Sequence, residues 1–210
     1  MSKKTAGAKH VLDTRDGSIA RPTNRRGQTM QTNVKIIWDQ GVNRGIMQFV
    51  VRVAQKDDEE SLWEMLYYAA RMAEDGAQNY HAAKTHPDLQ EYVADWGQVT
   101  DIGVVAVVAA QVVGAAWARP VQHEHIVDVP AAHHEIAIAV HPDFHGQGIG
   151  ATLMAGLNAL ADMRHIDLAL TVRDGNPAIR LYQRAGFVVV EEIINRVGGK
   201  SFVMQRKRMS

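Results

Sequence analysis

A strand, a glycine-rich loop and a helix follow one another from residue 135 onward, and this succession constrains the fold more than any other part of the chain. The segment EIAIAV at 135–140 has the composition of a strand, and so does LALTV at 168–172. The loop HPDFHGQGIG at 141–150 holds three alternating glycines. After it, apolar residues recur at helical spacing (Ile149, Leu153, Leu157 and Leu160). Two strands joined by a helix predict a parallel β-α-β unit with the loop at the start of its helix.

The three glycines indicate a loop that holds phosphate with its backbone. Gly146, Gly148 and Gly150 allow consecutive N–H groups to point into one concavity, because glycine adopts conformations that other residues avoid. A helix that starts near Gly148 adds the partial positive charge of its N-terminal end. Together these features suit a pyrophosphate. The alternative is a plain glycine-rich turn that lets the helix pack close to the sheet.

Two other phosphate-binding loops fit less well. A P-loop requires GxxxxGK[ST], and no Lys follows these glycines. The dinucleotide fingerprint GxGxx[GA] is nominally matched by Gly146, Gly148 and Ala151, but its glycines should lie directly at the strand end. Here residues 141–145 intervene, and Asp167 lies at the start of the next strand, where its carboxylate could not reach a ribose.

The chain before this unit predicts further strands and helices. QFVVRVA at 48–54 is typical of a strand. A capping-box pattern at Asp57–Glu60 precedes an amphipathic helix, and a second, weaker helix is expected over Asp88–Trp96. IGVVAV at 102–107 and VVGAAWA at 112–118 predict an antiparallel hairpin.

The best-defined helix follows the unit. Asn176 can cap it, Pro177 suits its first position and Gly186 can end it. FVVVEEII at 187–194 and SFVMQRK at 201–207 close the chain as two strands. The whole pattern predicts an α+β fold around a mixed sheet with one parallel β-α-β unit.

Composition excludes several classes of function. The chain has no cysteine, which excludes disulfides, thiolate catalysis and cysteine-based zinc sites. Its 23 Lys and Arg balance 23 Asp and Glu, so no overall field steers it to nucleic acid or a membrane. The longest apolar run, IGVVAVVAAQVVGAAWA, is too short and too β-branched for a membrane helix, and we identify no secretory signal. We therefore expect a cytoplasmic protein with no nucleic-acid or membrane partner.

Residues 1–46 are expected to be a basic, flexible extension. Residues 1–33 carry seven Lys or Arg against two Asp and have few large apolar side chains, so they cannot bury enough surface to order themselves. The extension is interpreted as a floppy tail or as translation from upstream of a true start at Met30 or Met47. A basic arm for nucleic acid or targeting is the alternative.

From about Met47 to its end, the chain resembles the GNAT superfamily of N-acetyltransferases. IAIAVHPDFHGQGIGATLM resembles the superfamily's acetyl-coenzyme A signature, [RQ]xxGx[GA], and NPAIRLYQRAGF resembles its second signature. One position departs from the pattern, because His145 stands where Arg or Gln is usual, and a His is a weaker, pH-dependent phosphate partner. The resemblance implies a GNAT-like fold over residues 47–210, with a mixed, mostly antiparallel sheet.

The resemblance also implies how acetyl-coenzyme A (acetyl-CoA) would bind. The backbone of Ile138–Val140 would pair with pantetheine where two parallel strands splay apart, and an N–H near Val140 would face the thioester oxygen. Asn176 would reach the cofactor, and Tyr182 would lie near the sulfur as general acid. By periodicity alone, Tyr182 is a core aromatic and Asn176 only a cap. The implied cofactor-binding residues are Ile138, Ala139, Val140, His145, Gly146, Gln147, Gly148, Ile149, Gly150, Ala151 and Asn176.

The general base is expected at the start of the strand before the glycine loop. Glu135 shares a strand face with Ala137 and Ala139, whose small side chains leave room beside its carboxylate. His134 is the alternative, since an imidazole titrates near neutral pH. Water would suffice for an amine of low pKa, and Glu135 would then be a solvated strand end.

The segment before this strand is rich in His and acidic residues, namely His123, Glu124, His125, Asp128, His133 and His134. A metal site would need a third ligand fixed by structure, so we expect no metal. We expect the segment to border the acceptor site, where its acids favour a cationic amine. Aromatic residues of the early helices form either an apolar acceptor wall or ordinary core: Trp63, Tyr67, Tyr68, Tyr80, Tyr92 and Trp96.

The expected activity is transfer of an acetyl group from acetyl-CoA to a primary amine of a small molecule or peptide. The amine attacks directly, because the chain has no cysteine to carry a covalent intermediate. A different acyl donor on the same scaffold and a non-catalytic coenzyme A-binding or regulatory module remain as alternatives. A homodimer is left open.

Overall fold

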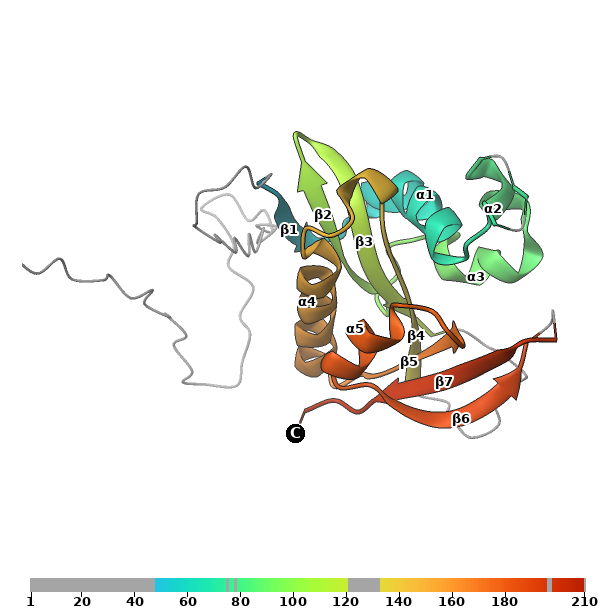
Figure 1. Cartoon of the computed structure of the whole chain (residues 1–210). Helices are drawn as coiled ribbons and strands as arrows, with labels where there is room; N and C mark the ends of the chain where they lie inside the picture. The colour runs from blue at the N-terminus through green and yellow to red at the C-terminus, as the bar shows by residue number, and fades with distance from the viewer. Residues whose placement is uncertain (1–47, 75, 78, 121–132, 196–197, 210) are drawn as a thin grey trace, which may run out of the picture. The chain divides into compact units, whose positions relative to one another are not determined.

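The computed structural model describes residues 48–209 apart from 75, 78, 121–132 and 196–197. These residues form a seven-stranded sheet with the order β1-β2-β3-β4-β5-β7-β6 (Figure 1). Neighbouring strands are antiparallel except β4 and β5, which are parallel. The predicted mixed sheet is therefore confirmed. The strands are β1 (Val50–Val53), β2 (Ile102–Val108), β3 (Gln111–Arg119), β4 (His133–Val140), β5 (Asp167–Arg173), β6 (Val188–Ile194) and β7 (Lys200–Arg206).

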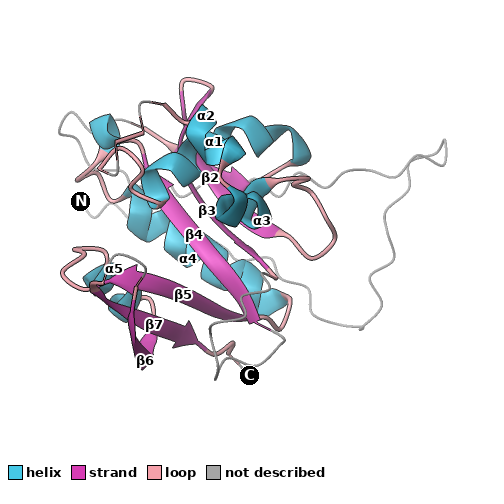
Figure 2. Cartoon of the chain, turned by 90° about the vertical axis from the view of Figure 1, so that its right-hand side faces the viewer, coloured by secondary structure: helices cyan, strands magenta, loops and turns pink. Residues whose placement is uncertain are grey.

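Helices lie on both faces of the sheet (Figures 1 and 2). One face is covered by α4, and α5 packs into the same hydrophobic cluster. The other face is covered by α1, α2 and α3. The helices are α1 (Glu59–Ala69), α2 (His81–Thr85), α3 (Gln90–Val93), α4 (Ile149–Met163) and α5 (Ile179–Arg184), with short 3-10 turns at Lys56–Asp58, Pro87–Leu89 and Pro142–Phe144.

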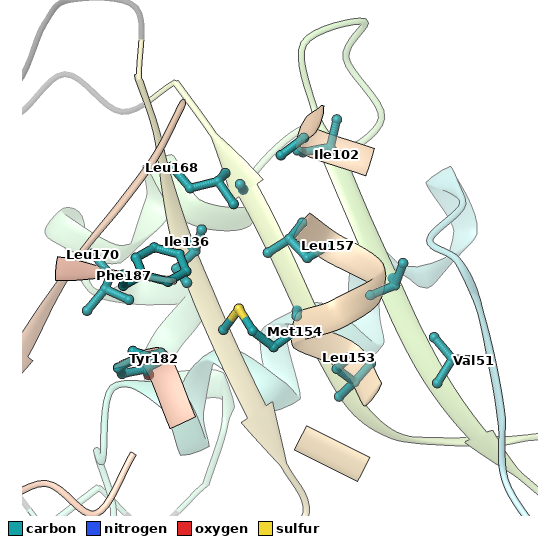
Figure 3. Close-up of a cluster of buried hydrophobic side chains, with 14 of the residues drawn as sticks. Val51, Ile102, Ile136, Leu153, Met154, Leu157, Leu168, Leu170, Tyr182 and Phe187 are labelled. Atoms are coloured by element: carbon teal, nitrogen blue, oxygen red, sulfur yellow. The ribbon is translucent and has the colours of Figure 1, made fainter. Parts of the chain in front are cut away.

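The two faces of the sheet support two apolar cores. On the α4 face, Leu153, Met154 and Leu157 pack into one cluster with Ile136 and Leu168 (Figure 3). On the other face, side chains of α1 and α3 pack around Trp117 of β3. Successive strand residues point to opposite faces, so a strand covered on both sides is apolar throughout. This explains the long apolar run over β2 and β3.

The parallel pair β4–β5 is short, and this defines the region of interest. It joins only His133 to Asp167, His134 to Leu168 and Glu135 to Ala169. Beyond Glu135, within the described residues, β4 pairs with β3 alone and β5 with β7 alone. The two strands therefore splay apart with Glu135 at the vertex, and Figure 2 shows them diverging. The splay expected from the resemblance is present.

Two local predictions differ from the structure. The capping box lies two residues earlier than predicted, because the Asp58 carboxylate accepts the Gln55 N–H at 2.7 Å. Arg52 donates two further hydrogen bonds to Asp58, at 2.6 and 2.7 Å, and so fixes the acid there. The segment expected to form a helix over Asp88–Trp96 instead forms a 3-10 turn followed by the four-residue α3. Pro87 begins a new turn because it has no backbone N–H to continue a helix, and tertiary contacts hold the segment.

Within the described residues, no helix is long and apolar enough to cross a membrane.

Candidate active site

A cavity of about 290 Å³ opens between the splayed part of β4, the glycine loop and α5. It contains nine of the thirteen predicted site residues, and Phe144, Ala178 and Leu181 line it in addition. Sequence analysis did not single out these three residues. The lining residues are Ile138, Ala139, Val140, Phe144, His145, Gly146, Gly148, Ile149, Gly150, Ala178, Leu181 and Tyr182.

The three glycines of the loop serve two different purposes. Gly146 and Gly148 have φ values of 76° and 80°, which side chains of L-residues disfavour. Gly148 is the N-cap of α4 and provides no side-chain cap, so the N–H groups of the first helical turn are left for another acceptor. Gly150 has an ordinary φ, and a Cβ there would lie 3.7 Å from Leu181 and project into the cavity region. The loop can therefore accept an anion at a helix N-terminus inside a cleft.

The predicted cofactor residues Gln147 and Ala151 do not line the cavity. Gln147 is half-buried in the loop and Ala151 is exposed on the first turn of α4. The N–H of Ala151 is nevertheless one of the uncapped groups of that turn.

His145 braces the loop against the end of β4. Its Nε2 lies 2.8 Å from the carbonyl oxygen of Val140, so Nε2 carries the proton and donates. The next N–H, that of His141, bonds to Val113 of β3 at 2.8 Å. The peptide between Val140 and His141 therefore directs its carbonyl away from β3, into the splay.

This orientation shows which backbone groups of β4 are accessible. In a strand, the N–H and C=O of one residue point to the same side and alternate along the chain. Ile138 and Val140 thus face the splay, whereas Ala139 faces β3. The carbonyl of Val140 is already bonded to His145, which leaves the Val140 N–H and both backbone groups of Ile138 directed toward the cavity.

Tyr182 of α5 lies at the apolar end of the cavity. Its side chain is 9% exposed and its ring packs edge-on against Phe187, with centroids 6.1 Å apart (Figure 3). Burial raises the pKa of Tyr182 to about 12, so the hydroxyl is a stable donor at neutral pH. Among the described residues, this hydroxyl makes no hydrogen bond.

The N-cap of α5 is Ala178, two residues after the predicted Asn176, and the helix runs only from Ile179 to Arg184. The Oδ1 of Asn176 accepts the N–H of Ala178 at 2.9 Å and so closes the turn before the helix. Gly186, with a φ of 92°, follows the end of that helix. Asn176 does not line the cavity, so its cofactor contact stays a prediction that would use Nδ2.

Glu135 is buried on the face of β4 opposite to α4, together with Ala137 and Ala139 as expected. Its side chain is 5% exposed, and Oε1 accepts a hydrogen bond from the Tyr92 hydroxyl at 2.7 Å. Glu135 is therefore not a solvated strand end. It stands at the vertex of the splay, where a carboxylate can accept a proton from a group placed between the strands.

His134 points to the other face and is a weaker candidate base. Its Nε2 donates to the carbonyl of Thr100 at 2.9 Å, and Nδ1 is buried without a partner among the described residues. Burial lowers the pKa of His134, which leaves the imidazole neutral but enclosed.

The aromatic residues and the His-rich segment expected near the acceptor site lie in different places. Trp63 and Trp96 are buried members of the second core, as the alternative interpretation held. Tyr68 of α1 instead packs edge-on against His141, 5.3 Å away, just after β4. His123, Glu124, His125 and Asp128, the centre of the conceivable metal site, lie outside the described residues, as does the basic extension.

A family model places this architecture among known proteins. The model described as an acetyltransferase (GNAT) domain matches residues 100–189, which contain β2 to α5 and both signatures. Residues 100–189 therefore match a GNAT acetyltransferase domain, and the resemblance drawn from the motifs in this region is confirmed. No curated protein matches the chain in a sequence comparison.

Solved structures agree in fold. The acetyltransferase of GNAT family from Streptococcus pneumoniae has 17% identity and a TM-score of 0.58, covering 77% of this chain and 100% of its own. The yncA structure from Salmonella typhimurium, with its cofactor acetyl-CoA, has 20% identity and a TM-score of 0.57, covering 77% and 95%. Aminoglycoside acetyltransferase AAC(6')-Ib, in complex with coenzyme A and kanamycin, has 17% identity and a TM-score of 0.53, covering 77% and 95%. At these identities the likeness establishes the fold alone.

Proposed function

We propose that this chain is an acetyl-CoA-dependent N-acetyltransferase, with a catalytic domain at residues 47–210, that acetylates a primary amine by direct attack. One observation carries the proposal: a single cavity joins the uncapped N-terminus of α4, the free backbone groups of splayed β4 and the hydroxyl of Tyr182. The anion-binding end suits the pyrophosphate of an acyl-coenzyme A, and the hydrogen-bonding edge of β4 suits its pantetheine. The buried proton donor suits the thioester. The neighbours solved with acetyl-CoA or coenzyme A support this assignment.

In the proposed complex, the substrate's pyrophosphate lies on the N–H groups from Gly148 to Ala151. These donors and the helix dipole both favour negative charge. The pantetheine amides pair with the backbone of Ile138, as an added half-strand in the splay. The thioester oxygen accepts the Val140 N–H, which then stabilises the oxyanion of the tetrahedral intermediate.

The proposed chemistry conserves atoms and charge. The amine nitrogen forms a bond to the thioester carbon and loses a proton to Glu135, directly or through water. The intermediate collapses, the carbon–sulfur bond breaks, and the thiolate accepts a hydrogen bond and then a proton from Tyr182. The products are an acetamide and coenzyme A. Glu135 then releases its proton to solvent and Tyr182 is reprotonated from solvent.

The raised pKa of Tyr182 sets a condition on this step. A hydroxyl with a pKa of about 12 is a poor acid toward an ordinary thiolate, whose conjugate pKa is about 8.5. A thiolate generated in the same apolar cavity is also disfavoured by burial, which raises the pKa of its thiol. Burial therefore raises the pKa of the thiol as well as that of Tyr182, so the thiolate and the tyrosinate compete for the proton on similar terms. Tyr182 donates a hydrogen bond to the sulfur even before the proton moves.

The test is turnover with a panel of primary amines that includes aminoglycosides, lysine peptides and peptides with free N-termini. Released coenzyme A is measured with a thiol reagent, and the chain contributes no background because it has no cysteine. The proposal predicts thiol release with at least one amine and a product heavier by one acetyl group. Binding of acetyl-CoA without turnover on any amine would favour the non-catalytic module. Faster turnover with propionyl- or succinyl-CoA would identify another acyl donor.

A further inference from the structure

We propose that Tyr92 is the positioning residue of Glu135: its hydroxyl holds the carboxylate in place, aimed at the vertex of the splay. This inference rests on the proposed function, because it concerns the base of that reaction. Tyr92 contacts Glu135 and not the reacting atoms.

The contact between the side chains of Tyr92 and Glu135 is short and buried. The Tyr92 hydroxyl donates to Oε1 of Glu135 at 2.7 Å, and the Glu135 side chain is buried. A hydrogen bond to a carboxylate is among the stronger hydrogen bonds in proteins, and it has a preferred direction. Burial and the nearby Glu135 raise the pKa of Tyr92 well above its usual range, so its hydroxyl remains a donor at any pH of interest.

The backbone that carries Tyr92 is anchored by β3. A helix of only four residues cannot hold itself, so α3 depends on outside partners. The indole N–H of Trp117 donates to the carbonyl of Tyr92 at 2.8 Å. The guanidinium of Arg119 donates to the carbonyls of Ala94 at 2.8 Å and Glu91 at 3.2 Å. These bonds fix the last turn of α3 on both sides of Tyr92.

Arg119 is itself held in place by a hydrogen bond to Asp101. Arg119 Nε donates to Oδ1 of Asp101 at 3.0 Å, and the other oxygen of Asp101 accepts the N–H groups of Gly97 and Gln98, both at 2.9 Å. Arg119 is also the residue of β3 that pairs with Glu135 of β4. The backbone of Arg119 therefore pairs with the strand residue Glu135, while its side chain holds the segment that carries Tyr92. Such convergence is more than packing of a core tyrosine requires.

A purely structural role for Tyr92 makes a different prediction. If Tyr92 only fills space, removing its hydroxyl lowers stability and leaves kcat per folded molecule unchanged. If Tyr92 aims Glu135, removing the hydroxyl lowers kcat per folded molecule and leaves the KM for acetyl-CoA unchanged.

The experiment compares Tyr92→Phe with the wild type in the full chain, using an amine from the panel. We expect kcat per folded molecule to fall several-fold, because the buried carboxylate loses the hydrogen bond that aims it, with the KM for acetyl-CoA within about two-fold. Glu60→Gln is the matched control, since it alters an exposed tyrosine–glutamate pair, Tyr80 Oη to Glu60 Oε1 at 3.0 Å, and should leave kcat unchanged. A Tyr92→Phe variant whose kcat per folded molecule equals that of the wild type would overturn the proposal.

A second measurement needs no turnover. Tyr92→Phe, Glu135→Gln and the double variant form a cycle for urea unfolding at pH 7.5. We expect the effects of the two single substitutions to be coupled by about five-fold in the unfolding equilibrium constant. Additive effects would contradict a direct contact between the two side chains. If no amine is acetylated, the proposed function fails while this cycle still decides whether Tyr92 and Glu135 are coupled.

Discussion

The two halves of the proposed site are built in different ways. The cofactor half lies mainly within residues 138–151 and uses chiefly backbone groups of β4, the loop and α4. The base corner joins the side chains of Tyr92 and Glu135, 43 positions apart, and depends on Trp117 and Arg119. A backbone site follows from local conformational preference, whereas a side-chain site follows from tertiary packing. Changes in the first half should therefore alter affinity, and changes in the second should alter rate.

The largest expected effect lies in the base corner. Glu135→Gln keeps the shape of the side chain and removes the proton acceptor, so kcat should fall by about 10³-fold. Titration calorimetry should give an acetyl-CoA affinity within about two-fold of the wild type. A kcat within a factor of five of the wild type would show that water, and not Glu135, accepts the proton.

The next effect concerns the proton donor. Tyr182→Phe preserves the ring packed on Phe187 but removes the hydroxyl, so kcat should fall by about 10²-fold with acetyl-CoA affinity nearly unchanged. Steady-state rates with the best amine of the panel measure this. Undiminished thiol release would remove Tyr182 from the mechanism and leave it as a core aromatic.

In the cofactor half, Gly148→Val should weaken acetyl-CoA binding by about 50-fold. A β-branched residue at a φ of 80° strains the N-cap and displaces the N–H groups that face the cavity. Gly198→Val is the matched control, because it imposes the same strain at a φ of 78° in the turn between β6 and β7. Equal affinity loss in both variants would mean that the effect is general destabilisation.

A smaller effect is expected at the brace of the loop. His145→Ala removes one hydrogen bond to the Val140 carbonyl and should weaken acetyl-CoA binding by about five-fold. His145→Gln, which can still donate to that carbonyl, should recover most of the affinity. His86→Ala, at an exposed histidine elsewhere, serves as control. If His145→Gln binds as weakly as His145→Ala, the imidazole acts on the phosphate and not as a brace.

The smallest effect concerns stability and His134. Burial lowers the pKa of His134 in the folded protein, so the unfolded chain binds a proton first as the pH falls below about 6.5. The stability that neutral His134 contributes is present above that pH and is lost on acidification toward its folded pKa. Urea unfolding at pH 7.5 and 5.5 should show a steeper loss for the wild type than for His134→Gln, which keeps a donor for the Thr100 carbonyl. Equal losses would mean that the imidazole is hydrated or charged in the folded state.

The contrast between the halves also explains what could be predicted from the sequence. The strand, loop and helix around Gly148 and the hairpin of β2 and β3 followed from spacing and glycine content, because those signals are local. The position of Glu135 on the strand face followed from alternation. Its burial did not, since it depends on α1 packing against β4 and on the contact with Tyr92 of α3.

The segment between α1 and β2 was predicted least well. α2 and α3 have five and four residues, too few for helical periodicity to be detectable, and the position of α3 is set by bonds from Trp117 and Arg119. The role of Tyr92 was missed for the same reason: an aromatic residue in a short helix carries no signal of a partner 43 positions away. The brace made by His145 was likewise hidden, because only the structure shows that its imidazole turns back to Val140.

The central claim is that acetyl-CoA occupies the splay and the glycine loop together. Hydrogen–deuterium exchange of backbone amides, with and without saturating acetyl-CoA, tests it most directly. The account predicts slowed exchange in peptides that cover residues 138–140 and 146–151, and unchanged exchange in β6, the strand at the far edge of the sheet. Slowed exchange that spared both of those stretches, or that appeared only elsewhere in the chain, would contradict it.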